Sequence, residues 1–174
     1  MLDGGVRNYD ARHLSSQKQY QVQMTNWYEI QITDIPDSII MLQNSMTLPE
    51  RSNPVVELPF GNSKAKVAGQ AEWGDGSLTV MDAITLDTEK AVEDWQNQVY
   101  DPQTGKMGWV NEYKREMIVT QRGPDGTYLR AWKYEGVWPS SVTYGELSGE
   151  SSDKKLLTLT LSYDRAYRLD TTNK

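Results

Sequence analysis

The chain of 174 residues has the length of a single domain, and it contains no cysteine, which excludes disulfide bonds and thiolate metal sites. Its formal net charge of −6 argues against binding of nucleic acid through a basic surface, because such binding needs clustered Lys and Arg side chains. No apolar run approaches the roughly 18 residues of a membrane span, and the first residues lack the apolar centre of a signal peptide, so we expect an unsecreted protein without a membrane anchor.

The first 17 residues are polar and show no hydrophobic period, so we predict an N-terminal arm that becomes ordered only when something docks on it. His13, the only histidine, lies in this arm. No recognisable motif places a carboxylate or a nucleophile beside it, and we interpret it as a surface residue. Alternating apolar residues then predict a first hairpin over 20–32, with Thr25-Asn26-Trp27 as its turn.

The segment Pro36 to Asn53 has no convincing period of either 2 or 3.6 residues. Excursions of this length in compact domains are usually functional or disordered, and this one is too apolar for disorder. We predict that it packs against this subunit or another one through apolar side chains, namely Ile39, Ile40, Met41, Leu42, Met46 and Leu48.

Residues 55–73 predict a second hairpin, because apolar side chains alternate on both sides of the turn Gly61-Asn62-Ser63. The opposite face of its second strand carries polar side chains, namely Lys64, Lys66, Gln70 and Glu72. After a glycine-containing turn, Ser77–Met81 is predicted to be a short strand because it is rich in residues that favour strands.

One helix is predicted, beginning at Asp87 or Thr88, either of which can cap it, and ending at Asp101-Pro102. Its apolar stripe consists of Ala91, Val92, Trp95 and Val99. Trp95 is the largest of these side chains, and we expect it to fill the gap between the helix and a twisted sheet.

The stretch Glu112–Pro139 predicts a long hairpin around the turn Gly123-Pro124-Asp125-Gly126. Side chains of one parity are expected to face the core, and they include Tyr113, Met117, Trp132 and Tyr134. Side chains of the other parity are expected to form a continuous polar face, and they include Lys114, Glu116, Thr120, Lys133 and Glu135. Strands of about 30 Å are longer than a small domain needs for its own core.

After an exposed loop over 148–155, alternating leucines predict a final strand that reaches Tyr163. The polar residues 165–174 are predicted to form a flexible tail. Many strands and one helix together predict a mainly β fold, an antiparallel β-sandwich or barrel with a helix packed on one end.

No sequence motif indicates chemistry. The phosphate-binding patterns GxxxxGK[ST] and GxGxxG are absent, and Asp75, Asp82 and Asp87 are spaced as turn and cap carboxylates rather than as metal ligands. We therefore expect no catalytic residue, cofactor or metal. A β-sandwich that binds or cleaves carbohydrate stays open as an alternative, because Trp and Tyr rings stack on sugars and a catalytic carboxylate pair is a spatial feature.

Several runs together resemble the tail tube protein of T-even-type contractile-tailed bacteriophages. These runs occur in the order that the family has, and they cover about Pro54 to Tyr163. They are Leu58-Pro59 with Lys66-Val67-Ala68-Gly69; Thr79-Val80-Met81 with Ala91 and Trp95; Glu112-Tyr113-Lys114 with Ile118-Val119 and Gln121; Gly136-Val137-Trp138-Pro139; and Gly145-Glu146-Leu147.

This resemblance implies one tail-tube domain over 1–174, with an arm at 1–17 and a flexible tail at 165–174. It implies a small β-sandwich whose two long hairpins join those of five neighbours into a hexameric ring barrel, and rings that stack into a tube for DNA. The implied partners are further copies of the chain, a sheath protein outside, tape-measure protein and DNA inside, and a baseplate and terminator at the ends. The implied location is the virion tail, after assembly in the host cytoplasm.

With this architecture, parity assigns a set of polar residues to the lumen, namely Lys66, Gln70, Glu72, Lys114, Glu116, Thr120, Lys133 and Glu135. The apolar excursion at 36–53 and the arm are expected to form contacts between rings. Exposed hairpin edges favour closure of a ring by head-to-tail pairing, and a lumen without a net basic lining would let DNA slide. The inner tube of a headless contractile injection particle stays open as an alternative, because it has the same fold.

Overall fold

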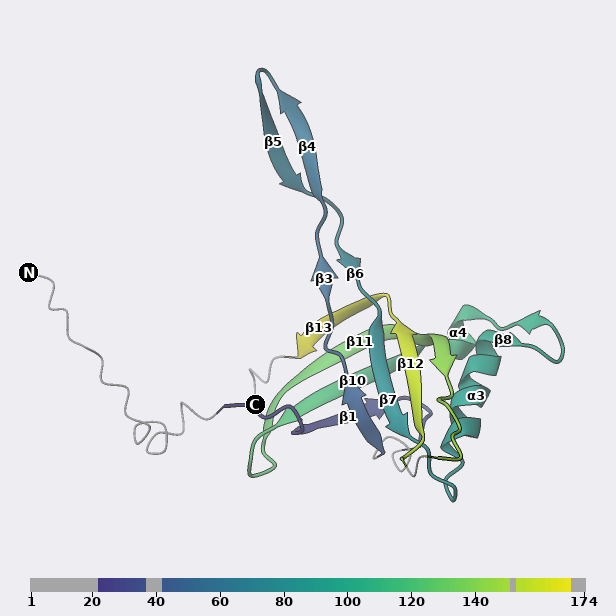
Figure 1. The fold of residues 1–174 in the computed structure, drawn as a ribbon. Coiled ribbons are helices and arrows are strands. Elements are labelled where there is room, and N and C mark those ends of the chain that lie inside the picture. The colour runs from purple at the N-terminus through teal and green to yellow at the C-terminus, as the bar shows by residue number, and fades with distance from the viewer. Residues whose placement is uncertain (1–21, 37–41, 151–152, 170–174) are drawn as a thin grey trace, which may run out of the picture.

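The computed structural model describes residues 22–36, 42–150 and 153–169 and shows a curved antiparallel sheet from which a thin hairpin projects (Figure 1). The predicted mainly β fold with one long helix is confirmed. The described helices and strands are, in chain order, β1 (Tyr28–Ile32), β2 (Gln43–Met46), β3 (Arg51–Ser52), β4 (Val55–Phe60), β5 (Ser63–Ala68), β6 (Glu72–Trp73), β7 (Gly76–Met81), α3 (Thr88–Val99), β8 (Tyr100–Asp101), β9 (Lys106–Met107), α4 (Val110–Tyr113), β10 (Arg115–Arg122), β11 (Tyr128–Thr143), β12 (Leu156–Ser162) and β13 (Arg165–Leu169).

The 16-residue strand β11 joins the two halves of the main sheet, whose strand order is β1-β10-β11-β12-β7-β2. The first half of β11 pairs with β10 on one side and with β13 on the other, whereas its second half pairs with β12. Gly136 lies between these halves with φ of 70°, a conformation that glycine adopts without strain. Opposite this point, between Arg115 and Met117, the register of the β10–β11 pairing shifts. A register shift of this kind is a β-bulge, and a β-bulge bends a strand.

The core consists of side chains from both halves of the sheet and from α3. Met117 on β10 and Tyr134 on β11 are completely buried, and they pack with leucines of β12 and with Trp95 of α3 in one cluster. The ring of Tyr134 meets that of Tyr163 edge to face at 5.1 Å, and its hydroxyl donates to the Thr47 carbonyl at 3.3 Å. Burial raises the pKa of Tyr134, which keeps this hydroxyl a donor.

Helix α3 begins where its sequence predicts. Asp87 is the N-cap, and its carboxylate accepts a hydrogen bond from the Lys90 backbone N–H at 3.3 Å. Trp95 is 1% exposed, and its indole Nε1 donates to the Tyr113 carbonyl at 2.9 Å. The Arg115 guanidinium lies 4.9 Å from the centre of the Trp95 ring, so α3, α4 and the start of β10 meet at this one side chain.

The predicted first hairpin is wrong in its first strand. The described residues 22–24 form no strand, and Val22 is 66% exposed. The second strand does form as β1, but it pairs with β10, which lies about ninety residues later in the chain. Alternation in the sequence identifies a strand without identifying its partner, because pairing depends on which sheet edge the fold makes available.

The central hairpin begins later than predicted. Val110–Tyr113 form α4, and β10 starts only at Arg115. The parity assigned to Tyr113 and Lys114 is therefore wrong, since the period of two residues holds only within a strand and the bulge beside Arg115 interrupts it.

Two segments in which no strand was predicted contribute strands to the main sheet. The excursion at 36–53 includes the edge strand β2, which pairs with β7, and also the short strand β3. The prediction of a flexible tail at 165–174 is wrong for Arg165–Leu169, because these residues form β13 and pair with β11. Residues 170–174 lie outside the described ranges, and so do residues 1–21, which include the predicted arm and His13. Both corrections concern edge strands, whose local pattern is weak because only one side is paired.

Replacement of Trp95 by Ala tests the packing of α3. We expect a loss of about 3 to 5 kcal/mol in the free energy of unfolding, because a large buried ring leaves a cavity and the Tyr113 carbonyl loses a donor. Urea unfolding of the unassembled subunit measures it. Trp109→Ala is the matched control, since that tryptophan is 76% exposed and its loss should stay within about 0.5 kcal/mol. If Trp95→Ala left the free energy of unfolding unchanged, the packing of α3 would not stabilise the subunit.

Replacement of Gly136 by Ala tests the bend in β11. A Cβ at this position would lie 2.2 Å from an Asp164 carboxylate oxygen, which Lys114 holds by contacts of 2.6 and 2.8 Å. Gly126 also has positive φ but has open space around it, so Gly126→Ala should lower the free energy of unfolding by only about 1–2 kcal/mol. We expect Gly136→Ala to lose about 1 kcal/mol more in thermal unfolding. Equal losses would argue against a steric role for Asp164.

Candidate assembly surfaces

No three or more His, Asp or Glu side chains come close enough to share a metal ion within the described ranges. Among the helices that the structure describes, none has the length and apolar character needed to cross a membrane. The conspicuous features are surfaces that a single copy leaves uncovered, and we describe three of them.

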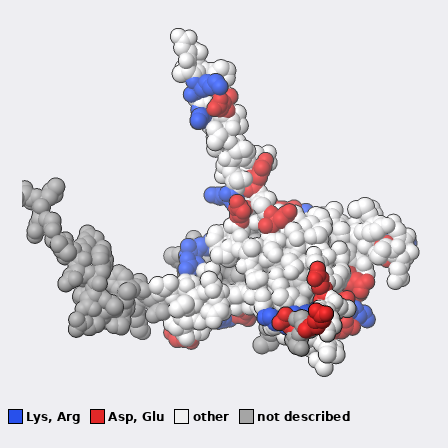
Figure 2. Space-filling view, in the orientation of Figure 1, with Lys and Arg blue, Asp and Glu red and all other residues white. Residues whose placement is uncertain are grey.

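The first surface is the projecting hairpin β4–β5, in which every residue of both strands is exposed (Figures 1 and 2). The pairs Val56↔Val67 and Leu58↔Ala65 place apolar side chains on one face, together with Phe60 at the tip, which is 77% exposed. The opposite face carries the ion pair Lys64–Glu57 at 2.9 Å. An isolated two-stranded hairpin is at best marginally stable in water, so this apolar face needs a partner.

The second surface is the outer face of the four strands β1, β10, β11 and β13, opposite the core. Lys133 lies at its centre, 3.0 Å from a Glu116 oxygen and 3.8 Å from a Glu135 oxygen. Glu135 also accepts hydrogen bonds from Arg165 and, at 2.9 Å, from the Tyr167 hydroxyl. Acidic and basic groups therefore neutralise one another on this face.

The same contacts shift the protonation equilibria of the cluster. Hydrogen bonds from Arg165 and then from Tyr167 hold the pKa of Glu135 below its ordinary value. The hydrogen bond to Glu116 raises the pKa of Lys133. Both groups are charged at neutral pH, so the cluster is a set of ion pairs rather than a proton-transfer site.

The structure brings together only half of the residues that parity assigned to one lumen face. Glu116, Thr120, Lys133 and Glu135 share the outer face of the four-stranded sheet, where Thr120 is opposite Ala131. The others lie elsewhere: Lys66 on β5, Gln70 between β5 and β6, Glu72 on β6, and Lys114 directly after α4, where it pairs with Asp164. Sequence reasoning also missed Arg165 and Tyr167, since it predicted no strand there.

The core set is likewise divided. Trp95, Met117 and Tyr134 lie in the buried cluster, and Trp132 packs against it while partly exposed. Tyr113 lies on α4, where its ring meets that of Trp138 at 5.8 Å.

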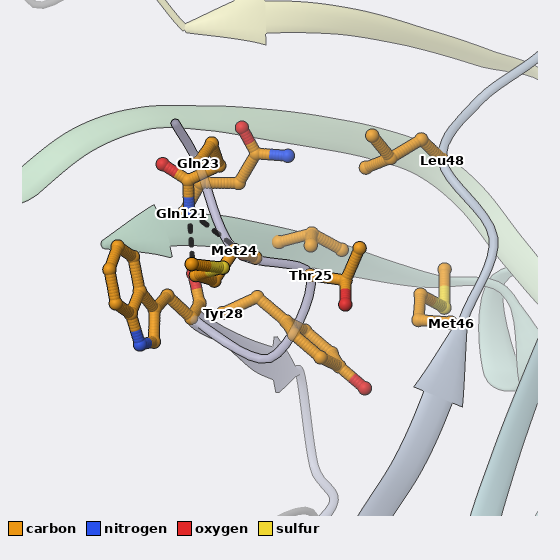
Figure 3. Close-up of a pocket in the computed structure, with 9 residues that line it drawn as sticks. Gln23, Met24, Thr25, Tyr28, Met46, Leu48 and Gln121 are labelled. Carbon is orange, nitrogen blue, oxygen red and sulfur yellow. Dashed lines mark hydrogen bonds between the residues drawn. The ribbon is translucent and has the colours of Figure 1, made fainter. Parts of the chain in front are cut away.

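The third surface lies between the edge strand β2 and the loop that precedes β1. It contains a cavity of about 210 Å³ lined mostly by apolar side chains, among them Met24, Tyr28, Met46 and Leu48 (Figure 3). Gln43 bridges the two edge strands, because its side-chain amide donates to the Tyr28 carbonyl at 3.0 Å. Of the six residues predicted for contacts between rings, Leu42, Met46 and Leu48 are described; Met46 packs partly on the core and Leu48 is exposed, whereas Ile39, Ile40 and Met41 lie outside the described residues.

Uncovered sheet edges accompany these surfaces. Within the described chain, β1 pairs only with β10 and β13 only with β11, so the outer edge of each of these strands has no strand partner. Monomeric proteins usually shield such edges from pairing with other chains. Unpaired strand edges and an exposed apolar hairpin are typical of a subunit that associates with further chains.

Comparison with known proteins shows the family of this chain. Residues 19–166 match the family described as T4-like virus tail tube protein gp19, and the chain belongs to this family. It is 26% identical over 143 residues to the tail tube protein gp19 of Enterobacteria phage T4, covering 80% of this chain and 87% of that protein. The corresponding protein of Enterobacteria phage T6 is 25% identical over the same length.

Solved structures with the same fold come from related particles. The tube-terminating cap of the anti-feeding prophage aligns with a TM-score of 0.70 at 17% identity, covering 86% of this chain and 91% of that one. A chain of the sheath–tube complex of the extracellular contractile injection system PVC aligns with a TM-score of 0.64 at 18% identity. The alignment covers 92% of this chain and 97% of that one. These likenesses concern the fold alone. The family match confirms the resemblance that the sequence runs indicated.

Replacement of Glu135 by Gln tests the ion-pair cluster through its pH dependence. Because the folded-state pKa is lowered, the stabilisation by the ionised carboxylate is present above its ordinary value of 4.5 and is lost as the pH falls through the lowered value. We expect the melting temperature of the wild-type subunit to exceed that of Glu135→Gln at about pH 7, and the difference to shrink as the pH falls below 4.5. Glu146→Gln, at an exposed loop position, is the control. A difference that persists unchanged at low pH would contradict this assignment.

Proposed function

We propose that this protein is the structural subunit of the inner tube of a contractile phage tail, in which hexameric rings stack into a hollow tube that conducts DNA into the host. The observation that carries the proposal is the four-stranded sheet β1–β10–β11–β13, in which each outermost strand has one edge without a strand partner in the described chain. Membership in the tail tube family supports it.

Ring closure follows from the two open edges. An edge strand of one copy can pair with the opposite edge of the next copy, and this heterologous contact either closes into a ring or continues as a filament. Closure satisfies every backbone N–H and C=O of both edge strands, which full barrels achieve and open sheets do not. The four strands of each copy then form one segment of a continuous ring barrel.

The polar outer face of this sheet would line the lumen, with Glu116, Thr120, Lys133 and Glu135 among its residues. Ion pairs with Glu116 and Glu135 neutralise the positive charge of Lys133 within this face. DNA would therefore meet a lining without a net basic charge, and it could pass without the counterion release that drives tight binding. Tape-measure protein would occupy the same lumen before DNA, and neither partner needs sequence-specific contacts.

The projecting hairpin would supply contacts to neighbouring copies through its apolar face. The region around β2 with Leu48, and the arm at 1–17, would add contacts between rings. The sheath would surround the tube, and a terminator and a baseplate would hold its ends. The inner tube of a headless injection particle is the second candidate, and the fold likeness to the anti-feeding prophage and PVC structures favours it.

Electron microscopy of the purified wild-type protein tests the proposal directly. We expect rings or tubes of constant diameter in negative stain, with six copies in each ring. A protein that remains monomeric at all concentrations, and that is retained on a glycan column, would overturn the proposal in favour of a carbohydrate-binding β-sandwich.

A matched pair of hairpin variants tests the role of the apolar face. Val56 and Val55 are neighbours on β4 that point to opposite faces, and Val56 shares its face with Leu58 and Phe60. We expect Val56→Asp to prevent tube formation and Val55→Asp to preserve it, because only the first places a charge in the buried contact. Both variants should melt like the wild-type subunit, since the hairpin lies outside the core. Equal assembly of the two would contradict the assignment.

A further inference from the structure

An apolar patch at the C-terminal end of α3 has no role in the surfaces described above. It consists of Tyr100, Met107, Trp109 and Val110, which are all exposed, and we call it the Trp109 patch. Tyr100 and Met107 are paired across β8 and β9, so their side chains share one face. Figure 2 shows the surface around β8 to be largely uncharged.

The backbone holds this patch in a defined position. The Trp109 N–H donates to a Glu112 carboxylate oxygen at 3.0 Å, and the Gly108 N–H donates to the Val99 carbonyl at 3.1 Å. An indole that is 76% exposed on such a fixed segment leaves a large apolar area in water. Contiguous apolar patches of this kind mark interaction sites.

A cleft with complementary chemistry lies at the other end of the β10–β11 hairpin. It has a volume of about 690 Å³ and is lined by the loop before β1 and by the turn between β10 and β11, including Val22, Trp27, Leu129 and Arg130. Its wall combines apolar side chains and the Arg130 guanidinium with polar residues that include Gln23 and Asp125. A Trp ring binds both apolar groups and a guanidinium.

The patch and the cleft cannot meet within one copy. The eight residues of β10 separate them by roughly 26 Å, and Figure 1 shows α4 and β8 at one end of the hairpin and its turn at the other. In the proposed ring the sides of the strands contact neighbours in the same ring, so the ends of the strands face the rings above and below.

We propose that the Trp109 patch of one copy inserts into the Arg130 cleft of a copy in the adjacent ring, so that this contact sets the stacking of rings. The proposal rests on the proposed function. The occupant is a second copy because a stack of identical rings brings opposite ends of the subunit together at every junction. The indole lies against the Arg130 guanidinium, and Glu112 beneath the patch brings a negative charge toward the same group.

A cross-linking experiment tests this contact. Because the chain has no native cysteine, only the introduced cysteines can react with the cross-linker. Tubes of the double variant Lys106→Cys with Thr127→Cys are treated with a short bismaleimide and separated on a denaturing gel. Lys106 is exposed beside the patch and Thr127 lines the cleft, so Trp109 and Arg130 stay in place. Contacts between rings should link chains along the tube and give products larger than six chains. The matched control pairs Lys106→Cys with Leu147→Cys, since Leu147 is exposed on a loop outside the cleft. It should give no such ladder.

Alanine variants provide a second readout that does not depend on the cysteines. Trp109→Ala should melt like the wild-type subunit yet need about tenfold or more protein for tube formation, as expected for an interface tryptophan. Leu147→Ala should assemble normally. Normal tubes from Trp109→Ala, or a ladder from the double variant that is absent or ends at the ring size, would overturn the inference. Absence of rings and tubes from the wild-type protein would instead reject the proposed function.

Discussion

The structure depends on one strand that belongs to two halves of the sheet. β11 pairs with β10 and β13 before Gly136 and with β12 after it, and the positive φ at Gly136 allows the change. Since Tyr134 and Val137, on either side of this point, are both completely buried, the bend keeps the core face continuous while the direction of the strand changes. The opposite face of the first half is thereby fixed as the outer face, where Lys133 and Glu135 lie.

A single copy of this fold leaves unmet interactions in several directions. Its strands β1 and β13 have uncovered edges, its hairpin β4–β5 exposes an apolar face, and the ends of the β10–β11 hairpin carry a patch and a cleft. A stable monomer would hide such features. In a stack of rings each would receive a separate neighbour: edges within the ring, hairpin and hairpin ends between copies. The core thus stabilises the single subunit, whereas assembly into the proposed rings would cover the remaining surfaces.

The outer face shows how charge can be present without attraction for a polyanion. Glu116 and Glu135 flank Lys133, and Arg165 also pairs with Glu135, so the charges compensate one another over a few ångströms. Exposed ion pairs of this type stabilise the fold little. In the proposed tube, their effect would lie in the electrostatic potential of the surface. A face of compensated pairs remains hydrated and polar but does not concentrate phosphate groups, so it would suit a channel through which DNA slides.

The sequence by itself determined the elements with a strong local period. Alternating leucines determined β12, the Asp87 cap and the apolar stripe determined α3, and the runs around Gly136-Val137-Trp138-Pro139 indicated the family. Only the tertiary structure decided that β1 pairs with β10, that residues 110–113 are helical, that Arg165–Leu169 extend the sheet, and that Lys66 and Lys133 lie on different sheets. The physical reason is that a residue's face follows from a period within one strand, whereas the partner of an edge strand, the position of a bulge and the separation of two hairpins depend on contacts between residues far apart in the chain.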